Sequence, residues 1–243
     1  MSALLEIEGL QKRFGGVRAV DDCSFAVEQG TITGLIGPNG SGKTTVFNLV
    51  TGYLTADGGH VRFGGSTVRR PDPTRLARRG LIRTFQQARV FSHLTVLENL
   101  VLASPQSWSS CGARRVGPAE RARGEQLLGE FNLADESDVA AEELSFGQRK
   151  LLEFAATLMS RPSIVLLDEP TAGVNPVLVQ AIEGHIRRLN AEGLTFLVVE
   201  HDMPLVMRLC HPVIVLDRGR KIAEGAAADV QRDPLVLDAY LGA

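Results

Sequence analysis

The residues with the clearest chemical potential form the segment GPNGSGKT at positions 37–44. It matches the pattern GxxxxGK[ST] and lies between an apolar run and a helical pattern. Glycines in such a loop let backbone N–H groups close around phosphate oxygens, and the helix N-terminus adds a favourable dipole. Lys43 would supply a positive charge for the outer phosphates, and Thr44 could place its hydroxyl on Mg²⁺. A glycine-rich turn with a solvated lysine is the alternative, which this context disfavours.

A second pair of candidates ends the apolar run IVLLDE at positions 164–169. Asp168 would hold Mg²⁺, directly or through water, and Glu169 would polarise the water that attacks a γ-phosphate. Two acids after an apolar strand usually form only a solvated strand end. The phosphate loop earlier in the chain is what favours the functional interpretation.

A third candidate is the segment LSFGQ at positions 144–148, which precedes a helical pattern. Its serine and glycine would leave a hydroxyl and open N–H groups beside the positive end of a helix dipole. This predicts a second phosphate-binding surface. A simple serine N-cap is the alternative, and it is common enough that the segment has little weight alone.

Alternating strands and helices must position these residues. The chain is strand-rich up to about Gly37, and continuous apolar runs that alternate with amphipathic helices favour an α/β fold with a mainly parallel sheet covered on both sides. We expect further strands at 31–36, 60–63, 81–86, 163–167 and 194–200, and helices at 43–53, 73–79, 148–159 and 176–190. A hairpin of 213–216 with 221–223 and a short helix would end the chain, so that residues 211–243 form a C-terminal appendage.

The middle of the chain has almost no strand pattern. Helical spacing at 94–103 and 119–131 is separated by a Ser/Gly/Pro-rich turn at 104–118. We interpret residues 90–147 as a helical insertion. With 243 residues, the chain has room for one domain, 1–243, that contains this insertion.

Composition excludes several classes of protein. Lys+Arg 26 against Asp+Glu 28 gives a formal net charge of -2, which offers no global attraction for nucleic acid. Cys23, Cys111 and Cys210 show no ligand spacing, so we expect reduced thiols rather than disulfides or zinc. There is no signal peptide and no apolar stretch of bilayer length, so we expect a soluble, cytoplasmic chain that reaches a membrane only through a partner.

Taken together, GPNGSGKT, LSFGQ and VLLDEP resemble the ATP-binding subunits of ABC transporters, in that family's order and over nearly the whole chain. The resemblance implies a P-loop NTPase fold with an N-terminal antiparallel β subdomain and an inserted helical subdomain. It also implies ATP and Mg²⁺ as ligands, with Asp168, Thr44 and Gln86 near the metal and Glu169, His201, Gln86 and Lys43 as catalytic residues. The implied nucleotide-binding residues are Phe14, Gly37, Pro38, Asn39, Gly40, Ser41, Gly42, Lys43, Thr44, Thr45, Ser145, Gly147 and Gln148.

Each remaining role rests on the same resemblance. Phe14 would stack on adenine, Gln86 would sense the membrane subunit, residues 172–175 would form the D-loop, and His201 would hydrogen-bond the γ-phosphate. Taken singly, Phe14 could be a core residue, Gln86 a surface amide and His201 a structural histidine. Two departures stand out: Phe146 replaces a glycine of the signature, and Asn175 replaces an aspartate of the D-loop.

Longer segments such as RTFQQARVF and VEHDMPLVM resemble the branched-chain amino acid uptake ATPases. This implies a peripheral subunit on the inner face of the cell membrane, with a second ATP-binding subunit, two permease subunits and, indirectly, a solute-binding protein, and no nucleic acid. Val90, Phe91 and Leu94 would be exposed to the permease. The alternatives are amide or urea uptake, export, a soluble ABC protein of translation or DNA repair, a non-hydrolytic regulatory subunit and a P-loop kinase.

Overall fold

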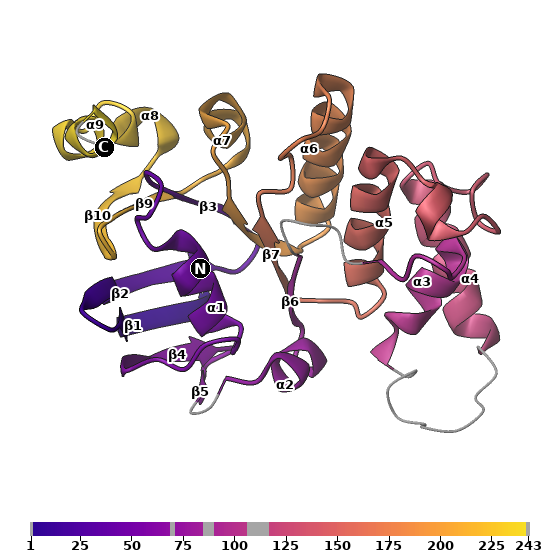
Figure 1. The fold of residues 1–243 in the computed structure, drawn as a ribbon, viewed down its shortest axis with the longest axis horizontal. Helices are drawn as coiled ribbons and strands as arrows, with labels where there is room; N and C mark the ends of the chain where they lie inside the picture. Colours follow the sequence, from indigo (N-terminus) through magenta and orange to yellow (C-terminus); the bar gives the residue numbers. More distant parts are fainter. Residues whose placement is uncertain (1, 69–70, 85–89, 106–116, 242–243) are drawn as a thin grey trace.

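The computed structural model describes residues 2–68, 71–84, 90–105 and 117–241. The two sheets lie toward one end of the molecule, and the helices of the middle of the chain lie at the other end (Figure 1). The first sheet is antiparallel, with the order β2-β1-β4-β5. Its strands are β1 (Ala3–Phe14), β2 (Val17–Glu28), β4 (Gly58–Phe63) and β5 (Ser66–Val68). An N-terminal antiparallel β subdomain is therefore confirmed.

The second sheet has the order β10-β9-β3-β8-β7-β6, and all of its neighbours are parallel except the hairpin β9–β10. Its strands are β3 (Ile32–Ile36), β6 (Leu81–Arg83), β7 (Ile164–Asp168), β8 (Thr195–Val199), β9 (Val213–Asp217) and β10 (Arg220–Gly225). β3, β7 and β8 are buried at every residue. Both faces of this sheet are thus covered, as continuous apolar runs predict.

Side chains alternate between two hydrophobic cores along each central strand. On β7, Val165 and Leu167 pack into one core and Ile164 and Leu166 into the other. The second core also contains residues of α1 (Lys43–Val50), including Phe47, and of the antiparallel sheet. The first core runs on without a break into the inserted helices. The phosphate loop and the acidic strand end therefore share one rigid scaffold.

The inserted helices pack on each other and on the far side of the central layer (Figure 1). They are α3 (Val96–Leu102) and α4 (Pro118–Glu130), and α5 (Phe146–Leu158), which begins where the predicted insertion ends, packs against both. A side-chain stack joins them to α6 (Pro176–Ala191), because the His185 ring lies 4.1 Å from the Phe131 ring at an interplanar angle of 13°. Arg188 adds an ion pair to Glu130 at 3.1 Å.

Several details differ from the sequence-based expectations. Three elements have no counterpart among the predicted ones: β5, α7 (Met203–Leu209) and α8 (Ala227–Val230), since one helix and not two was expected after the C-terminal hairpin. α5 begins at Phe146 and not at 148, since Ser145 caps it. Leu94 and Val90 are half-buried rather than exposed, and Val90 packs against the first core, whereas Phe91 is 62% exposed. Cys23 and Cys210 are buried thiols, and Cys111 lies outside the described residues.

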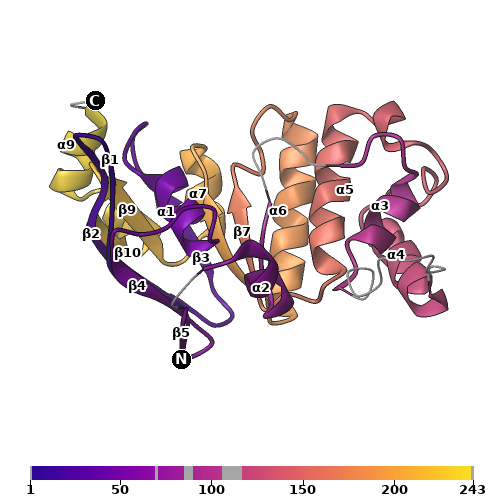
Figure 2. The same ribbon diagram turned by 60° about the horizontal axis from the view of Figure 1, so that its bottom comes forward.

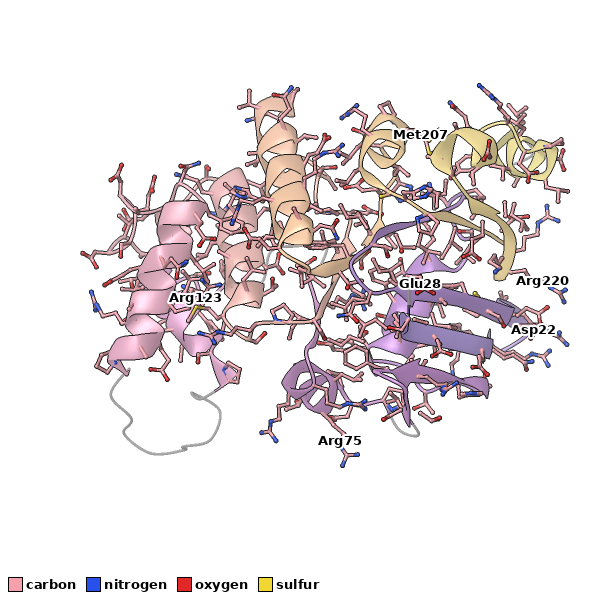
Figure 3. All side chains as sticks on the ribbon, turned by 180° about the vertical axis from the view of Figure 1, so that it is seen from behind. Asp22, Glu28, Arg75, Arg123, Met207 and Arg220 are labelled. Carbon is pink, nitrogen blue, oxygen red and sulfur yellow. The ribbon has the colours of Figure 1, made fainter. Side chains whose placement is uncertain are left out.

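The C-terminal region comprises the hairpin β9–β10, α8 (Ala227–Val230) and α9 (Pro234–Leu241). Arg220 on β10 forms an ion pair with Asp21 of β2 at 2.7 Å, which ties the hairpin to the antiparallel sheet. Figure 3 shows Arg220 at the outer edge of that sheet, close to Asp22. Within the described residues, every helix is too short or too polar to span a bilayer.

Candidate functional site

The phosphate loop connects β3 to α1, as the sequence predicts. Gly37 has φ 150° and Gly42 has φ 103°, conformations that L side chains rarely adopt. A Cβ at Gly37 would lie 2.1 Å from the Leu216 carbonyl oxygen, and one at Gly42 would lie 2.5 Å from the Ala19 carbonyl oxygen. Glycine is therefore required at both positions. No side chain caps the N-terminus of α1, so its first N–H groups are left for an anion.

Lys43, the first residue of α1, is folded back onto the loop. Its Nζ donates to the carbonyl oxygens of Gly37 at 2.8 Å and Pro38 at 2.9 Å, and to Ser41 Oγ at 3.4 Å. Burial lowers the pKa of Lys43, and the charges of Glu169 and Asp168 oppose that shift. The lysine of one motif and the carboxylates of the other are thus within electrostatic reach of each other.

Glu169 and His201 meet where the neighbouring parallel strands β7 and β8 end. His201 Nε2 lies 2.6 Å from Glu169 Oε1, a distance at which the imidazole N–H donates a hydrogen bond to the carboxylate. Both side chains border a cavity of about 460 Å³, whose wall also contains Ala172 of the D-loop segment. A carboxylate held by a histidine in an open cavity is suited to accept a proton from water.

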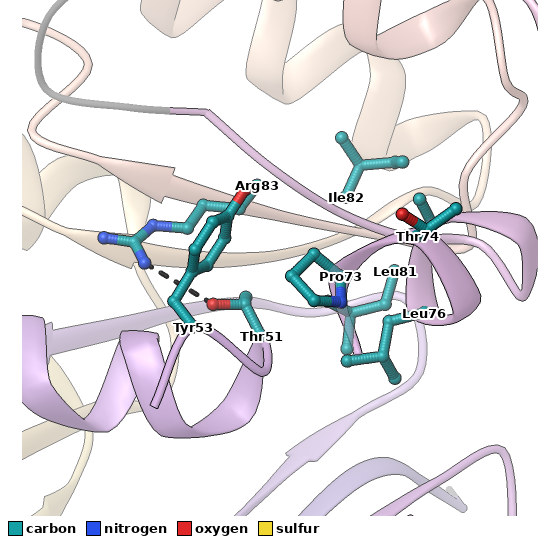
Figure 4. Close-up of a pocket in the computed structure, with 9 residues that line it drawn as sticks. Thr51, Tyr53, Pro73, Thr74, Leu76, Leu81, Ile82 and Arg83 are labelled. Carbon is teal, nitrogen blue, oxygen red and sulfur yellow. Dashed lines mark hydrogen bonds between the residues drawn. The ribbon is translucent and has the colours of Figure 1, made fainter. Parts of the chain in front are cut away.

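Asp168 has a different environment from its neighbour. Arg83 Nη2 donates to Asp168 Oδ2 at 2.6 Å, and the two side chains are 6% and 8% exposed. Arg83 Nη1 donates to Asn48 Oδ1 at 2.6 Å and to Thr51 Oγ1 at 3.4 Å, both on or just after α1. Figure 4 shows the bond to Thr51 and the ring of Tyr53 beside the guanidinium, at the rim of a cavity of about 220 Å³. Arg83 therefore links β6, β7 and α1.

Thr44 and Asp168 are the two residues predicted near the metal that lie within the described part of the chain. A hydroxyl and a carboxylate are the hard oxygen donors that this ion takes alongside nucleotide phosphates. The described residues contain no cluster of three or more His, Cys, Asp or Glu side chains that could hold a metal by itself. Phosphate oxygens and water are the further ligands that Mg²⁺ takes beside such side chains.

The signature segment caps α5. Ser145 Oγ accepts from the Gln148 N–H at 3.2 Å, and Gln148 Oε1 accepts from the Ser145 N–H at 3.0 Å, which is a full capping box. Phe146 is 45% exposed. α5 and α1 lie apart in both views, with α6 between them (Figures 1 and 2). The chain does not bring its own signature segment to its own phosphate loop.

Phe14, Asn175 and Gln86 were also predicted to take part in the site. Phe14 ends β1 and is 48% exposed, so part of its ring is open for stacking, while Lys12 Nζ lies over the ring at 5.7 Å from its centre. Asn175, the D-loop variant, accepts from the Leu178 N–H at 2.9 Å and caps α6. Gln86 lies outside the described residues.

Three charged residues in the site were not predicted from the sequence: Arg83, Lys150 and Glu200. Lys150 and Glu200 are 7% and 4% exposed. The available signal was a single charge within or directly after a buried run, as in LIRTF and FLVVEH. Such a charge is unexpected in a core unless it has a partner.

Two family models match the chain. The ABC transporter model matches residues 20–172, and the model described as branched-chain amino acid ATP-binding cassette transporter matches residues 220–243. The chain belongs to the ABC transporter family, as one of its ATP-binding cassettes, and its enzymatic class is that of an ATPase. The fold class implied by the sequence resemblance is confirmed.

Full-length relatives and solved structures agree with this assignment. The chain is 37% identical to the high-affinity branched-chain amino acid transport ATP-binding protein BraF of Pseudomonas aeruginosa, over 98% of each chain. It is 38% identical to the probable branched-chain amino acid transport ATP-binding protein LivG of Archaeoglobus fulgidus, over 99% of this chain and 96% of that one. A cassette crystallised in its ADP conformation has a TM-score of 0.90 at 35% identity, over 100% of both chains. A dimeric bacterial ABC transporter cassette has a TM-score of 0.80 at 27% identity, over 92% of this chain and 98% of that one.

Proposed function

We propose that the chain is the ATP-hydrolysing subunit of an importer that takes up branched-chain or related amino acids. The observation that carries the hydrolytic part is the 2.6 Å contact between Glu169 and His201 within electrostatic reach of Lys43. A regulatory subunit that only binds nucleotide would have no use for this pair. The names of the relatives support the importer and its substrate.

The residues divide the work as follows. The loop 37–44 and Lys43 hold the phosphates, Thr45 extends the contact along α1, and Phe14 stacks on adenine. Asp168, Thr44 and Gln86 hold Mg²⁺, which shields the phosphate charge when bound. Glu169 takes the proton of the attacking water, while His201 orients Glu169 and contacts the γ-phosphate.

One chain holds half of each catalytic site. Because α5 lies apart from α1 (Figures 1 and 2), Ser145, Gly147 and Gln148 would complete the phosphate loop of a second ATP-binding subunit. The dimeric cassette among the similar structures supports this arrangement. The γ-phosphate would contact both subunits and ADP would not, so ATP closes the dimer and hydrolysis reopens it.

The further partners follow from the transporter family. Two permease subunits would span the membrane and receive the motion of the segment 90–147, with Phe91 as an exposed apolar contact. A solute-binding protein would deliver the amino acid outside the cell. The chain would be cytoplasmic, bound to the inner face of the membrane. We propose residues 1–243 as one domain, because the first core crosses between the inserted helices and the central sheet.

Glu169→Gln, placed in the producing cells in place of the natural chain, tests this function. Uptake of labelled leucine, urea and acetamide is compared with wild-type cells and with cells that lack the chain. Loss of leucine uptake alone supports the proposal. Loss of urea or acetamide uptake instead supports the amide alternative, greater retention of a solute supports export, and unchanged transport of all of them overturns the hydrolytic role.

A further inference from the structure

Two buried charged side chains contact the segment 169–171. Lys150 comes from α5, and Glu200 directly follows β8. The first is 7% exposed and the second 4%. No nucleotide-binding role has been assigned to either residue, so their burial so close to Glu169 requires a separate explanation.

Glu200 joins the segment to His201. Its Oε1 accepts from the Thr171 N–H at 2.9 Å and from Thr171 Oγ1 at 2.6 Å, and its Oε2 accepts from the His201 N–H at 3.1 Å. A carboxylate only accepts, which suits three donors, whereas a glutamine would turn an NH₂ group toward one of them. One side chain therefore sets the position of both backbones that carry the catalytic pair.

Lys150 holds the same segment from the helical side. Its Nζ donates to the carbonyl oxygens of Glu169 at 3.2 Å and Pro170 at 3.4 Å, and it lies 5.6 Å from the centre of the Phe146 ring. Burial lowers the pKa of Lys150, and the nearby charges of Glu153, Glu200 and Glu169 oppose that shift. α5, which begins directly after the signature serine, thus contacts the catalytic loop through the Lys150 ammonium group.

The held segment has an uncommon backbone conformation. Glu169 has φ 49°, in the left-handed region that a residue with a Cβ avoids. Its N–H donates to the Val199 carbonyl oxygen at 2.9 Å, and its own carbonyl oxygen accepts from Lys150. Such a conformation persists only when the surroundings hold it, and it is the conformation in which the Glu169 carboxylate meets His201.

Stability alone is a poor reason for these two charges. Buried ionic groups can often be replaced by well-packed apolar residues without loss of stability, and their desolvation is costly. Apolar residues form no hydrogen bonds, so they cannot fix the direction of the carbonyl groups of Glu169 and Pro170. The same holds for the N–H groups of Thr171 and His201.

We propose that Lys150 and Glu200 are positioning residues for ATP hydrolysis, which hold the backbone of Glu169–Thr171 so that the Glu169 carboxylate faces His201. The proposal rests on the roles of Glu169 and His201 proposed above. Neither residue is assigned a contact with ATP, so their loss should slow turnover and leave nucleotide binding unchanged.

The test uses the full chain and measures kcat, KM for ATP and Tm for Glu200→Gln, Lys150→Met and the milder Thr171→Val. We expect each of the three to lower kcat at least tenfold and to change KM less than twofold. Thr171→Ser keeps the hydroxyl and should restore kcat to within twofold of wild type. Glu183→Gln is the matched control, since Glu183 is a carboxylate of 12% side-chain exposure paired with Arg187 and Arg208, and should leave kcat unchanged.

The outcomes separate positioning from folding. If a variant has a lower Tm but its folded protein keeps kcat within twofold of wild type, the residue acts in folding and the proposal is overturned. This result for Thr171→Val alone is sufficient. A raised KM for ATP with unchanged kcat would also overturn it, because these residues would then act in nucleotide binding and not in hydrolysis. Glu169→Gln is measured in parallel: if it turns over like wild type, the hydrolytic role of Glu169 fails first, and the positioning proposal fails with it.

Discussion

Arg83 Nη2 lies 2.6 Å from Asp168 Oδ2, and both side chains are buried. The guanidinium also binds Asn48, so the carboxylate assigned to the metal is fixed to the helix that begins at the phosphate loop. The end of β7 and the helix that follows the phosphate loop are therefore joined by the hydrogen bonds of one side chain.

Arg83→Met should lower the free energy of unfolding by about 3–5 kcal/mol, because it leaves the buried Asp168 charge without its partner. Urea denaturation of the nucleotide-free protein measures this. The double variant Arg83→Met/Asp168→Asn should lose clearly less than the sum of the two single losses. Additive losses would mean that the pair does not act as a unit.

Lys43→Ala should weaken ATP binding roughly 10- to 100-fold, the range for hydrogen bonds to a charged group. The three acceptors of Lys43 Nζ lie within the loop, so the charge is already held beside the site that phosphate would occupy. Titration with a fluorescent ATP analogue measures the affinity. Lys221→Ala, which removes an ion pair with Glu224 on β10, is the control. Equal affinity of Lys43→Ala and wild type would contradict the phosphate-loop assignment.

The described residues include two capping boxes, and comparing them separates the structural role of Ser145 from its proposed nucleotide role. Ser145 caps α5 and Thr95 caps α3. Ser145→Ala and Thr95→Ala should each cost about 1 kcal/mol of stability, measured by thermal unfolding. Only Ser145→Ala should also lower ATP turnover, by roughly tenfold or more, because it removes the proposed contact with the ATP that the second subunit binds. Equal turnover of the two variants would leave Ser145 as a helix cap and nothing more.

His185 should make stability depend on pH. Its burial and the charge of Arg188 lower the pKa of His185, and Glu130 opposes the shift. The unfolded state therefore binds a proton at a higher pH than the folded state, so stability is lost as pH falls below about 6.5 toward the folded pKa. His185→Gln should lose less stability than wild type between pH 7.5 and pH 5.5 in urea titrations. An identical loss of stability in both proteins would show that protonation of His185 does not contribute to the pH dependence.

The elements that could be predicted from sequence are those in which local pattern and tertiary burial agree. β3, β7 and β8 are continuous apolar runs, and α6 has a regular apolar face, so their positions were predictable to within a few residues. α7 was missed because a seven-residue helix shows too little periodicity. The three-residue β5 was missed because its strand character arises from pairing with β4.

The residues of the site also differ in how far the sequence could predict them. Lys43, Asp168 and Glu169 could be named because their chemistry is tied to a fixed spacing, whereas the role of His201 came only from family resemblance. Arg83, Lys150 and Glu200 have no such spacing, since their partners are 85, 19 and 29 residues away in the chain. Only the folded structure brings those partners together.

In the proposed function, two chains close on ATP and complete each other's catalytic sites. Light scattering of purified Glu169→Gln with Mg²⁺ and either ATP or ADP, alone and mixed with a paralogous cassette, tests it most directly. We expect the mass to double with ATP and to stay that of a monomer with ADP, and the mixture that doubles identifies the partner. If ATP binds and the mass never changes, with or without the permease present, the composite site is contradicted.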